Sequence, residues 1–142
     1  MGLSVTLDSG RAACTDSIDA FVRATSTFSE YELLGASRCH GWSRWDVVAH
    51  VVAGWQEMLG GMVSPVDEAA SVDAATYWTA FAKEFATDDP VPRLVSQRRR
   101  TSAYVRPASA ITQLRDVAAT VRRGVFSLAP VFHDGADGGI AA

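Results

Sequence analysis

Apolar residues recur along most of this chain at steps of three and four, the spacing that places side chains on one face of a helix. A capping-type residue, Asp8 or Ser9, opens the first such run, which predicts a helix to about Phe28. The same spacing returns over residues 43–60, 74–86, 92–104 and 108–128. Without convincing strands or internal repeats, the chain is predicted to be all-α, a bundle of three long helices and a shorter one.

Turn and breaker residues separate these runs. The turn-rich segment "GASRCHG" precedes Ser43, and Ser43 with Asp46 has the spacing of a capping box, which predicts a helix start. Gly60 and Gly61 predict the end of this helix, because glycine readily takes the left-handed conformation that terminates helices. Pro107 either separates two helices or kinks one long helix.

The length of 142 residues suits one domain, expected over residues 1–130, followed by a flexible glycine-rich tail over residues 131–142. Hydrophobic residues make up 48% of the chain and charged residues 20%, the balance of a soluble globular protein. A formal charge of −3 gives no general attraction to nucleic acid, so no nucleic-acid partner is expected.

Cysteine usage and the lack of signal-peptide and membrane-spanning patterns predict a cytoplasmic protein. Cys14 and Cys39 form no CxxC pair or disulfide framework, which favours free thiols in a reducing compartment. The N-terminus lacks the basic start and apolar core of a signal peptide, and no apolar run approaches the roughly 20 residues that span a bilayer.

Lys83 is the only lysine beside many arginines, which we interpret as the coding bias of a GC-rich, actinobacterial type of genome.

His50 stands out as an imidazole in the middle of the apolar helix that begins near Ser43. It lies four residues after Asp46 and four before Gly54, so these three residues share one stripe of the helix. A lone helical histidine is commonly a packed residue bonded to a carbonyl oxygen. A metal site needs at least three donors, and this helix supplies one, so spacing alone does not decide between these roles.

The segment "GWSRWDVVAHVVAGWQEML" resembles the DinB-like, mycothiol-dependent maleylpyruvate isomerase N-terminal domain family, and "LRDVAATVRRGVFSLA" resembles its long third helix. The resemblance implies a DinB-like helical bundle in which His50 binds a divalent metal, commonly zinc, in a pocket between helices. It also implies that the metal activates a thiol such as mycothiol for isomerisation or transfer. The matching positions are Gly41, Trp42, Asp46, Val47, Val48, Ala49, His50, Gly54 and Trp55.

The sequence departs from the family pattern at its C-terminal end. The family's other two ligands lie on a final helix of the form Val-Glu-Leu-x-Val-His, and this chain instead ends in "VFHDGADGGIAA". The fourth family helix is therefore expected to be missing or shortened. His133, with Asp134 or Asp137, is the candidate for completing the site from the tail. A missing helix would also leave an apolar groove, which predicts a homodimer that covers it.

Two functions remain open: a metal-binding, thiol-dependent isomerase or transferase, and a non-catalytic relative that acts as a binding or assembly module. Arg98, Arg99 and Arg100 are either an anion- or thiol-binding group or a solvated helix face. Ser43, Asp46 and Trp42 are expected to have structural or capping roles. Aromatic residues at helical spacing usually pack in a core, which is the expectation for the tryptophans at positions 42, 45, 55 and 78.

Overall fold

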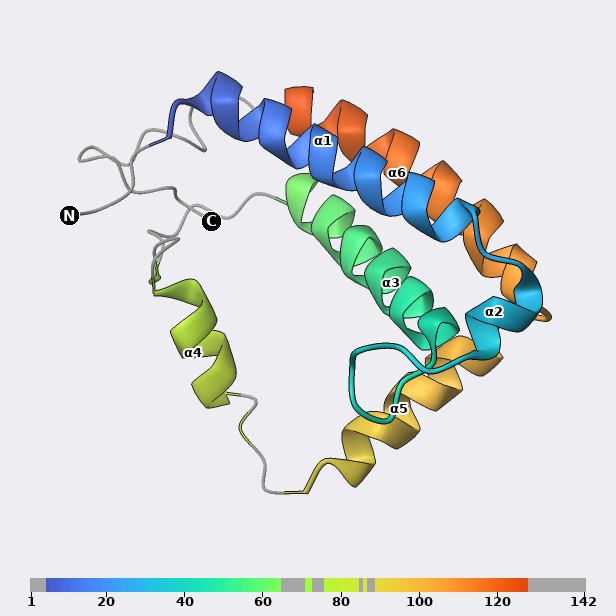
Figure 1. Ribbon diagram of the computed structural model, residues 1–142. Coiled ribbons are helices and arrows are strands. Elements are labelled where there is room, and N and C mark those ends of the chain that lie inside the picture. Colours follow the sequence, from blue (N-terminus) through green and yellow to red (C-terminus); the bar gives the residue numbers. More distant parts are fainter. Residues whose placement is uncertain (1–4, 65–70, 73–75, 85, 87–88, 128–142) are drawn as a thin grey trace.

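The computed structural model describes residues 5–64, 71–72, 76–84, 86 and 89–127. Within these ranges the chain forms six helices and no strand, with one isolated bridge between Ala36 and Ser43 (Figure 1). The predicted all-α class is confirmed. The helices are α1 (Leu7–Ser26), α2 (Glu30–Leu34), α3 (Arg44–Met62), α4 (Tyr77–Glu84), α5 (Val91–Ser102) and α6 (Pro107–Ser127).

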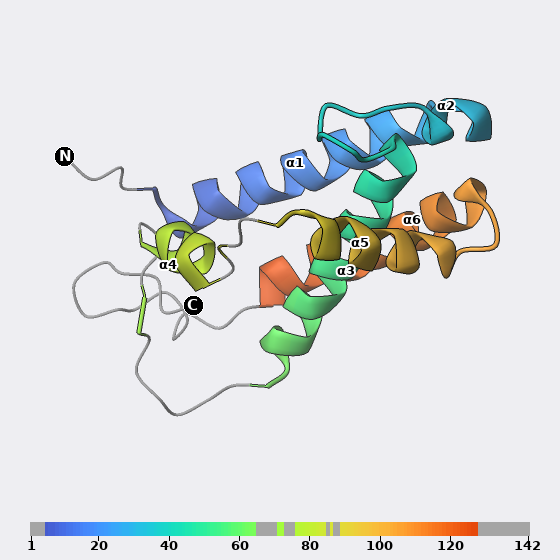
Figure 2. The same cartoon turned by 90° about the horizontal axis from the view of Figure 1, so that it is seen from below.

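The core lies where α1 and α3 pack against α6. Figure 1 shows α1 running along α6, and Figure 2 shows α5 lying across α3. Each fully buried aliphatic side chain contributes about 1.5–3 kcal/mol, so this cluster is the main source of stability. Its buried members are Ile18, Leu33, Val48, Val52, Ala110, Ile111, Leu114, Val117, Ala118, Val121 and Val125.

The helix start predicted at Ser43 is confirmed, because Ser43 is the N-cap of α3. The alternatives left open at Pro107 are resolved in favour of two helices. Helix α5 ends at Ser102, and Pro107 is the first residue of α6, where its missing N–H is no loss. The short helix α2 was not predicted, since a single turn has no visible period.

Helix α4 differs from the prediction, because its aromatic residues are exposed. The Trp78 side chain is 70% exposed, so the expectation that this tryptophan packs in the core was wrong. Tyr77, Trp78 and Phe81 instead contact one another. Periodicity correctly places the three rings on one face but does not tell what covers that face. Trp45 and Trp55 do pack against the core, as expected.

The predicted tail, with His133, Asp134 and Asp137, lies outside the described residues. The division into a domain over 1–130 and a tail stays a prediction. None of the described helices is both long enough and apolar enough to cross a bilayer.

Candidate functional site at the start of α3

The first turn of α3 is closed by a reciprocal cap between Ser43 and Asp46. The Ser43 amide donates to Asp46 Oδ2 at 2.8 Å, and the Asp46 amide donates to Ser43 Oγ at 3.0 Å. These two bonds satisfy amides that a helix start otherwise leaves unpaired. The carboxylate also lies at the positive end of the helix dipole, which stabilises its charge. The capping box that the sequence predicts is therefore present.

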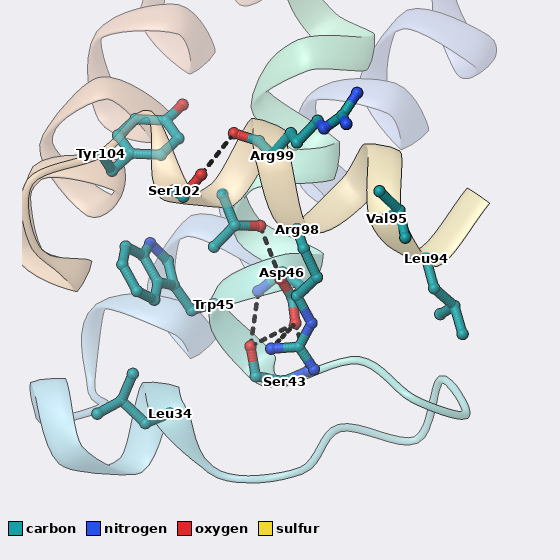
Figure 3. Close-up of a pocket in the computed structure, with 11 residues that line it drawn as sticks. Leu34, Ser43, Trp45, Asp46, Leu94, Val95, Arg98, Arg99, Ser102 and Tyr104 are labelled. Atoms are coloured by element: carbon teal, nitrogen blue, oxygen red, sulfur yellow. Dashed lines mark hydrogen bonds and ion pairs between the residues drawn. The ribbon is translucent and has the colours of Figure 1, made fainter. Parts of the chain in front are cut away.

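Asp46 is also the anchor that joins α3 to α5. The residue is fully buried, and its Oδ1 accepts a hydrogen bond of 2.7 Å from Thr101 Oγ1. The Arg98 guanidinium lies 3.6 Å from Oδ2 (Figure 3). Burial would raise the pKa of Asp46, but the hydrogen bonds from Thr101 and Ser43 and the charge of Arg98 outweigh it, so the pKa is lowered. Asp46 is consequently an ionised, fully engaged structural carboxylate.

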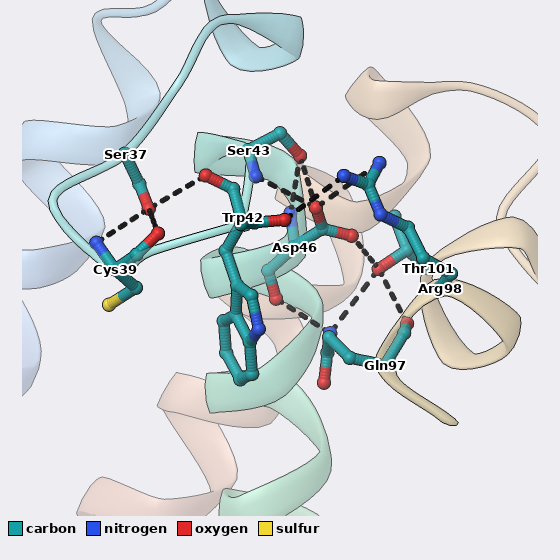
Figure 4. Close-up of polar contacts among 9 residues, drawn as sticks. Ser37, Cys39, Trp42, Ser43, Asp46, Gln97, Arg98 and Thr101 are labelled. Carbon is teal, nitrogen blue, oxygen red and sulfur yellow. Dashed lines mark hydrogen bonds and ion pairs between the residues drawn. The ribbon is translucent and has the colours of Figure 1, made fainter. Parts of the chain in front are cut away.

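Gln97 forms a second buried link between the same two helices. Its side chain is 3% exposed, and its Nε2 donates to the Asp46 carbonyl oxygen at 2.8 Å (Figure 4). Sequence reasoning did not single out Gln97. The arginines that follow it and the 51 residues that separate it from Asp46 hide its burial from any local pattern.

The loop before α3 holds Trp42 against the helix. Gly41 has a φ of 78°, in the left-handed region that glycine tolerates, and this turn leads the chain into Trp42. The Trp42 carbonyl accepts from Ser37 Oγ at 3.0 Å, and the Gly41 carbonyl accepts from Arg98 Nη2 at 3.1 Å (Figure 4). These contacts tie the loop to α5 and direct the indole along α3.

His50 lies one turn beyond Asp46, with its side chain exposed rather than enclosed between helices. The edge of its ring meets the Trp42 indole, with centroids 5.1 Å apart and an interplanar angle of 68°. Partial desolvation and the charge of Arg100 lower the pKa of His50, against opposing contributions from Glu57 and a hydrogen bond with Gln97. The imidazole is therefore neutral at pH 7 and retains a lone pair that could bind a cation.

The described residues supply only part of a metal site. No group of three His, Cys, Asp or Glu side chains among them could hold a metal ion. His50 fits as one imidazole ligand, but its identified neighbours include a tryptophan, a glutamine and an arginine. His133, the second predicted ligand, lies outside the described residues, so its proximity to His50 stays a prediction.

The three consecutive arginines do not converge on one point. Arg98 turns toward Asp46 and Gly41, while Arg100 lies near Gln97, 3.5 Å from its Oε1, and near His50. Arg98 and Arg99 both line a pocket of about 690 Å³ between α5 and the start of α3 (Figure 3), whereas Arg100 does not. The apolar lining of that pocket is formed by Leu34, Trp45, Leu94, Val95 and Tyr104. Anion or thiol binding by Arg98, Arg99 and Arg100 stays a prediction.

Comparison with known proteins identifies the family of this chain. No curated protein and no solved structure matches the chain. Residues 12–131 match the family model described as the mycothiol maleylpyruvate isomerase N-terminal domain. The match includes the capping box, His50, and the helices α3, α5 and α6 that carry the site. Since it extends over most of the 142 residues, the chain belongs to the mycothiol maleylpyruvate isomerase N-terminal domain family.

Proposed function

We propose that this protein is a metal- and thiol-binding domain in which His50 supplies one imidazole ligand to a divalent cation. The observation that carries the proposal is the state of His50, a neutral and exposed imidazole one turn from a rigid helix–helix anchor. A neutral imidazole is the form that binds zinc, and zinc is the cation we expect. Membership of a mycothiol-related family supports a small thiol as the second ligand.

The other metal ligands must come from elsewhere, because the described residues contain no three-donor group. We propose that they come from His133 and its neighbours or from a second copy of the chain. A bound divalent metal would lower the pKa of a thiol and so provide thiolate at neutral pH. The positive charge of Arg100 near His50 would favour the same thiolate. Isomerisation or group transfer is the reaction type that we propose for such a site.

The proposed assembly is a homodimer in the cytoplasm. Exposed apolar side chains on α4 support self-association, since Trp78 is 70% and Phe81 43% exposed. Sedimentation velocity over a concentration series tests this directly. Dimerisation weakened by Trp78→Ser is the expected result, and a monomer at every concentration would contradict it.

Metal analysis of the full chain purified without a histidine tag tests the metal proposal. We expect about one zinc per chain, or one per dimer, after zinc-replete expression, and its loss in His50→Ala. His40→Ala is the matched control, because His40 is also exposed but lies in the loop before α3. The proposal fails if wild-type protein binds no metal, or if both variants lose the same amount.

A non-catalytic binding or assembly module is the second candidate function. Its supporting observation is the positive charge of Arg100 close to His50, which disfavours a bound cation there. This candidate predicts a metal-free wild-type protein whose stability is unchanged by zinc or by a chelator. If His50→Ala also destabilises that metal-free protein, His50 has a packing role against Trp42.

A further inference from the structure

We propose that Gln97 is a positioning residue that holds His50 in one tautomer and one ring orientation. Gln97 is almost completely buried. Its Nε2 donates to the Asp46 carbonyl at 2.8 Å and also lies 3.3 Å from Thr101 Oγ1. A carbonyl oxygen accepts only a donor, so the amide cannot flip without losing this buried bond.

The orientation of Nε2 determines where the amide oxygen of Gln97 points. In Figure 4 this oxygen is directed along α3, away from the Asp46 carbonyl and on the same side as the Trp42 indole. His50 follows Asp46 by one helical turn and contacts that indole edge-on. The imidazole thus contacts the Trp42 indole and forms a side-chain hydrogen bond with Gln97. Arg100 Nη1, at 3.5 Å from Oε1, leaves this acceptor oxygen free to take a second, stronger bond.

A fixed acceptor beside a neutral imidazole selects its tautomer. The ring nitrogen that faces Gln97 must carry the proton, because an unprotonated nitrogen there would oppose two lone pairs. The other ring nitrogen then keeps its lone pair and is the one available to a ligand. Helix α5 therefore presets His50 for binding, in the way that outer partners commonly orient metal-binding histidines. The presetting of His50 for metal binding rests on the proposed function, whereas the preference for a single tautomer does not.

Two-bond proton–nitrogen correlation spectra of histidine-labelled, metal-free protein at pH 8 test the inference. We expect wild-type His50 to show one protonated and one unprotonated ring nitrogen, and Gln97→Leu to shift the tautomer ratio at least about threefold. Ser102→Ala is the structural control, because Ser102 lies on the same helix, is exposed and bonds to the Arg99 carbonyl rather than to Gln97 or Asp46.

The outcomes separate this inference from the proposed function. Mixed tautomers in the wild type would overturn the inference even if Gln97→Leu does not fold. Equal tautomer ratios in the wild type and a folded Gln97→Leu variant would also overturn it. A single, Gln97-dependent tautomer in a protein that binds no metal would support the inference and reject the metal proposal.

Discussion

The hydroxyl of Thr101 in α5 donates a hydrogen bond of 2.7 Å to Oδ1 of Asp46 in α3. Thr101 is 5% exposed and Asp46 is fully buried, so water cannot replace this bond. It joins the start of the helix that carries His50 to a helix more than 50 residues further along the chain. The geometry around His50 therefore depends on a buried polar contact as well as on the apolar core.

Thr101→Val tests the energetic weight of this contact. Valine has nearly the same shape but leaves one oxygen of a buried carboxylate without its partner, so we expect a loss of about 1.5–3 kcal/mol in the free energy of unfolding. Urea denaturation measures it. Ser102→Ala is the neighbouring control, since Ser102 is exposed and bonds only to the Arg99 carbonyl. Equal stabilities of the two variants would show that the contact is not stabilising.

Asp46→Ala should be the more damaging substitution in the same network. It removes the reciprocal cap of α3 and also leaves the Thr101 hydroxyl and Arg98 without their carboxylate. We expect a loss of about 3 kcal/mol or more, measured by urea denaturation. Asp16→Ala on the exposed face of α1 should change stability by less than about 0.5 kcal/mol. A loss below about 1 kcal/mol for Asp46→Ala would contradict the anchoring role.

The lowered pKa of Glu30 predicts how the free energy of unfolding depends on pH in the acid range. Hydrogen bonds from Arg106 and from the Ala108 amide lower the pKa of Glu30 from 4.5 to about 2. The carboxylate thus caps the start of α6. Because the folded-state value lies below the unfolded one, this stabilisation is complete above pH 4.5 and is lost as the pH falls toward 2. Urea denaturation at several pH values should show that the free energy of unfolding falls less steeply between pH 4.5 and 2 in Glu30→Gln than in the wild type. Identical declines would refute the assignment.

Gly54 is a position where an added methyl group should stabilise the protein. It lies inside α3, and a Cβ built there meets no atom within 4 Å. Gly54→Ala should therefore raise the free energy of unfolding by about 0.5–1 kcal/mol, measured by thermal or urea denaturation. Gly124→Ala is the comparison, because its Cβ would lie 2.8 Å from Met62 Sδ. A destabilised Gly54→Ala variant would show that this stripe of α3 is more crowded than the structure indicates.

The fold was largely predictable because its signals are local. The apolar period and the Ser43–Asp46 spacing predicted α3, and the resemblance around His50 named the family that the comparison confirms. What sequence reasoning missed depends on contacts between distant residues. Nothing near Gln97 indicates burial, and nothing near Trp78 indicates that its face of α4 would be exposed.

The candidate site was predictable only in part, for a related reason. The role of Asp46 as a helix cap follows from a three-residue spacing, but its bonds to Thr101 and Arg98 require knowing how α5 packs. The exposure of His50 likewise depends on which helices cover α3. The arginine run shows the same limit, since Arg98 and Arg99 line one pocket while Arg100 contacts Gln97 instead.

The most direct test of the central claim is a zinc titration of full-length, histidine-labelled protein followed through the ring nitrogens of His50. We expect one equivalent of zinc per site to shift the resonance of the His50 ring nitrogen that faces away from Gln97. The ring-nitrogen resonances of His40 should not change. Ring-nitrogen signals of His50 that stay in place while zinc is added in excess would contradict the claim that this imidazole binds a metal.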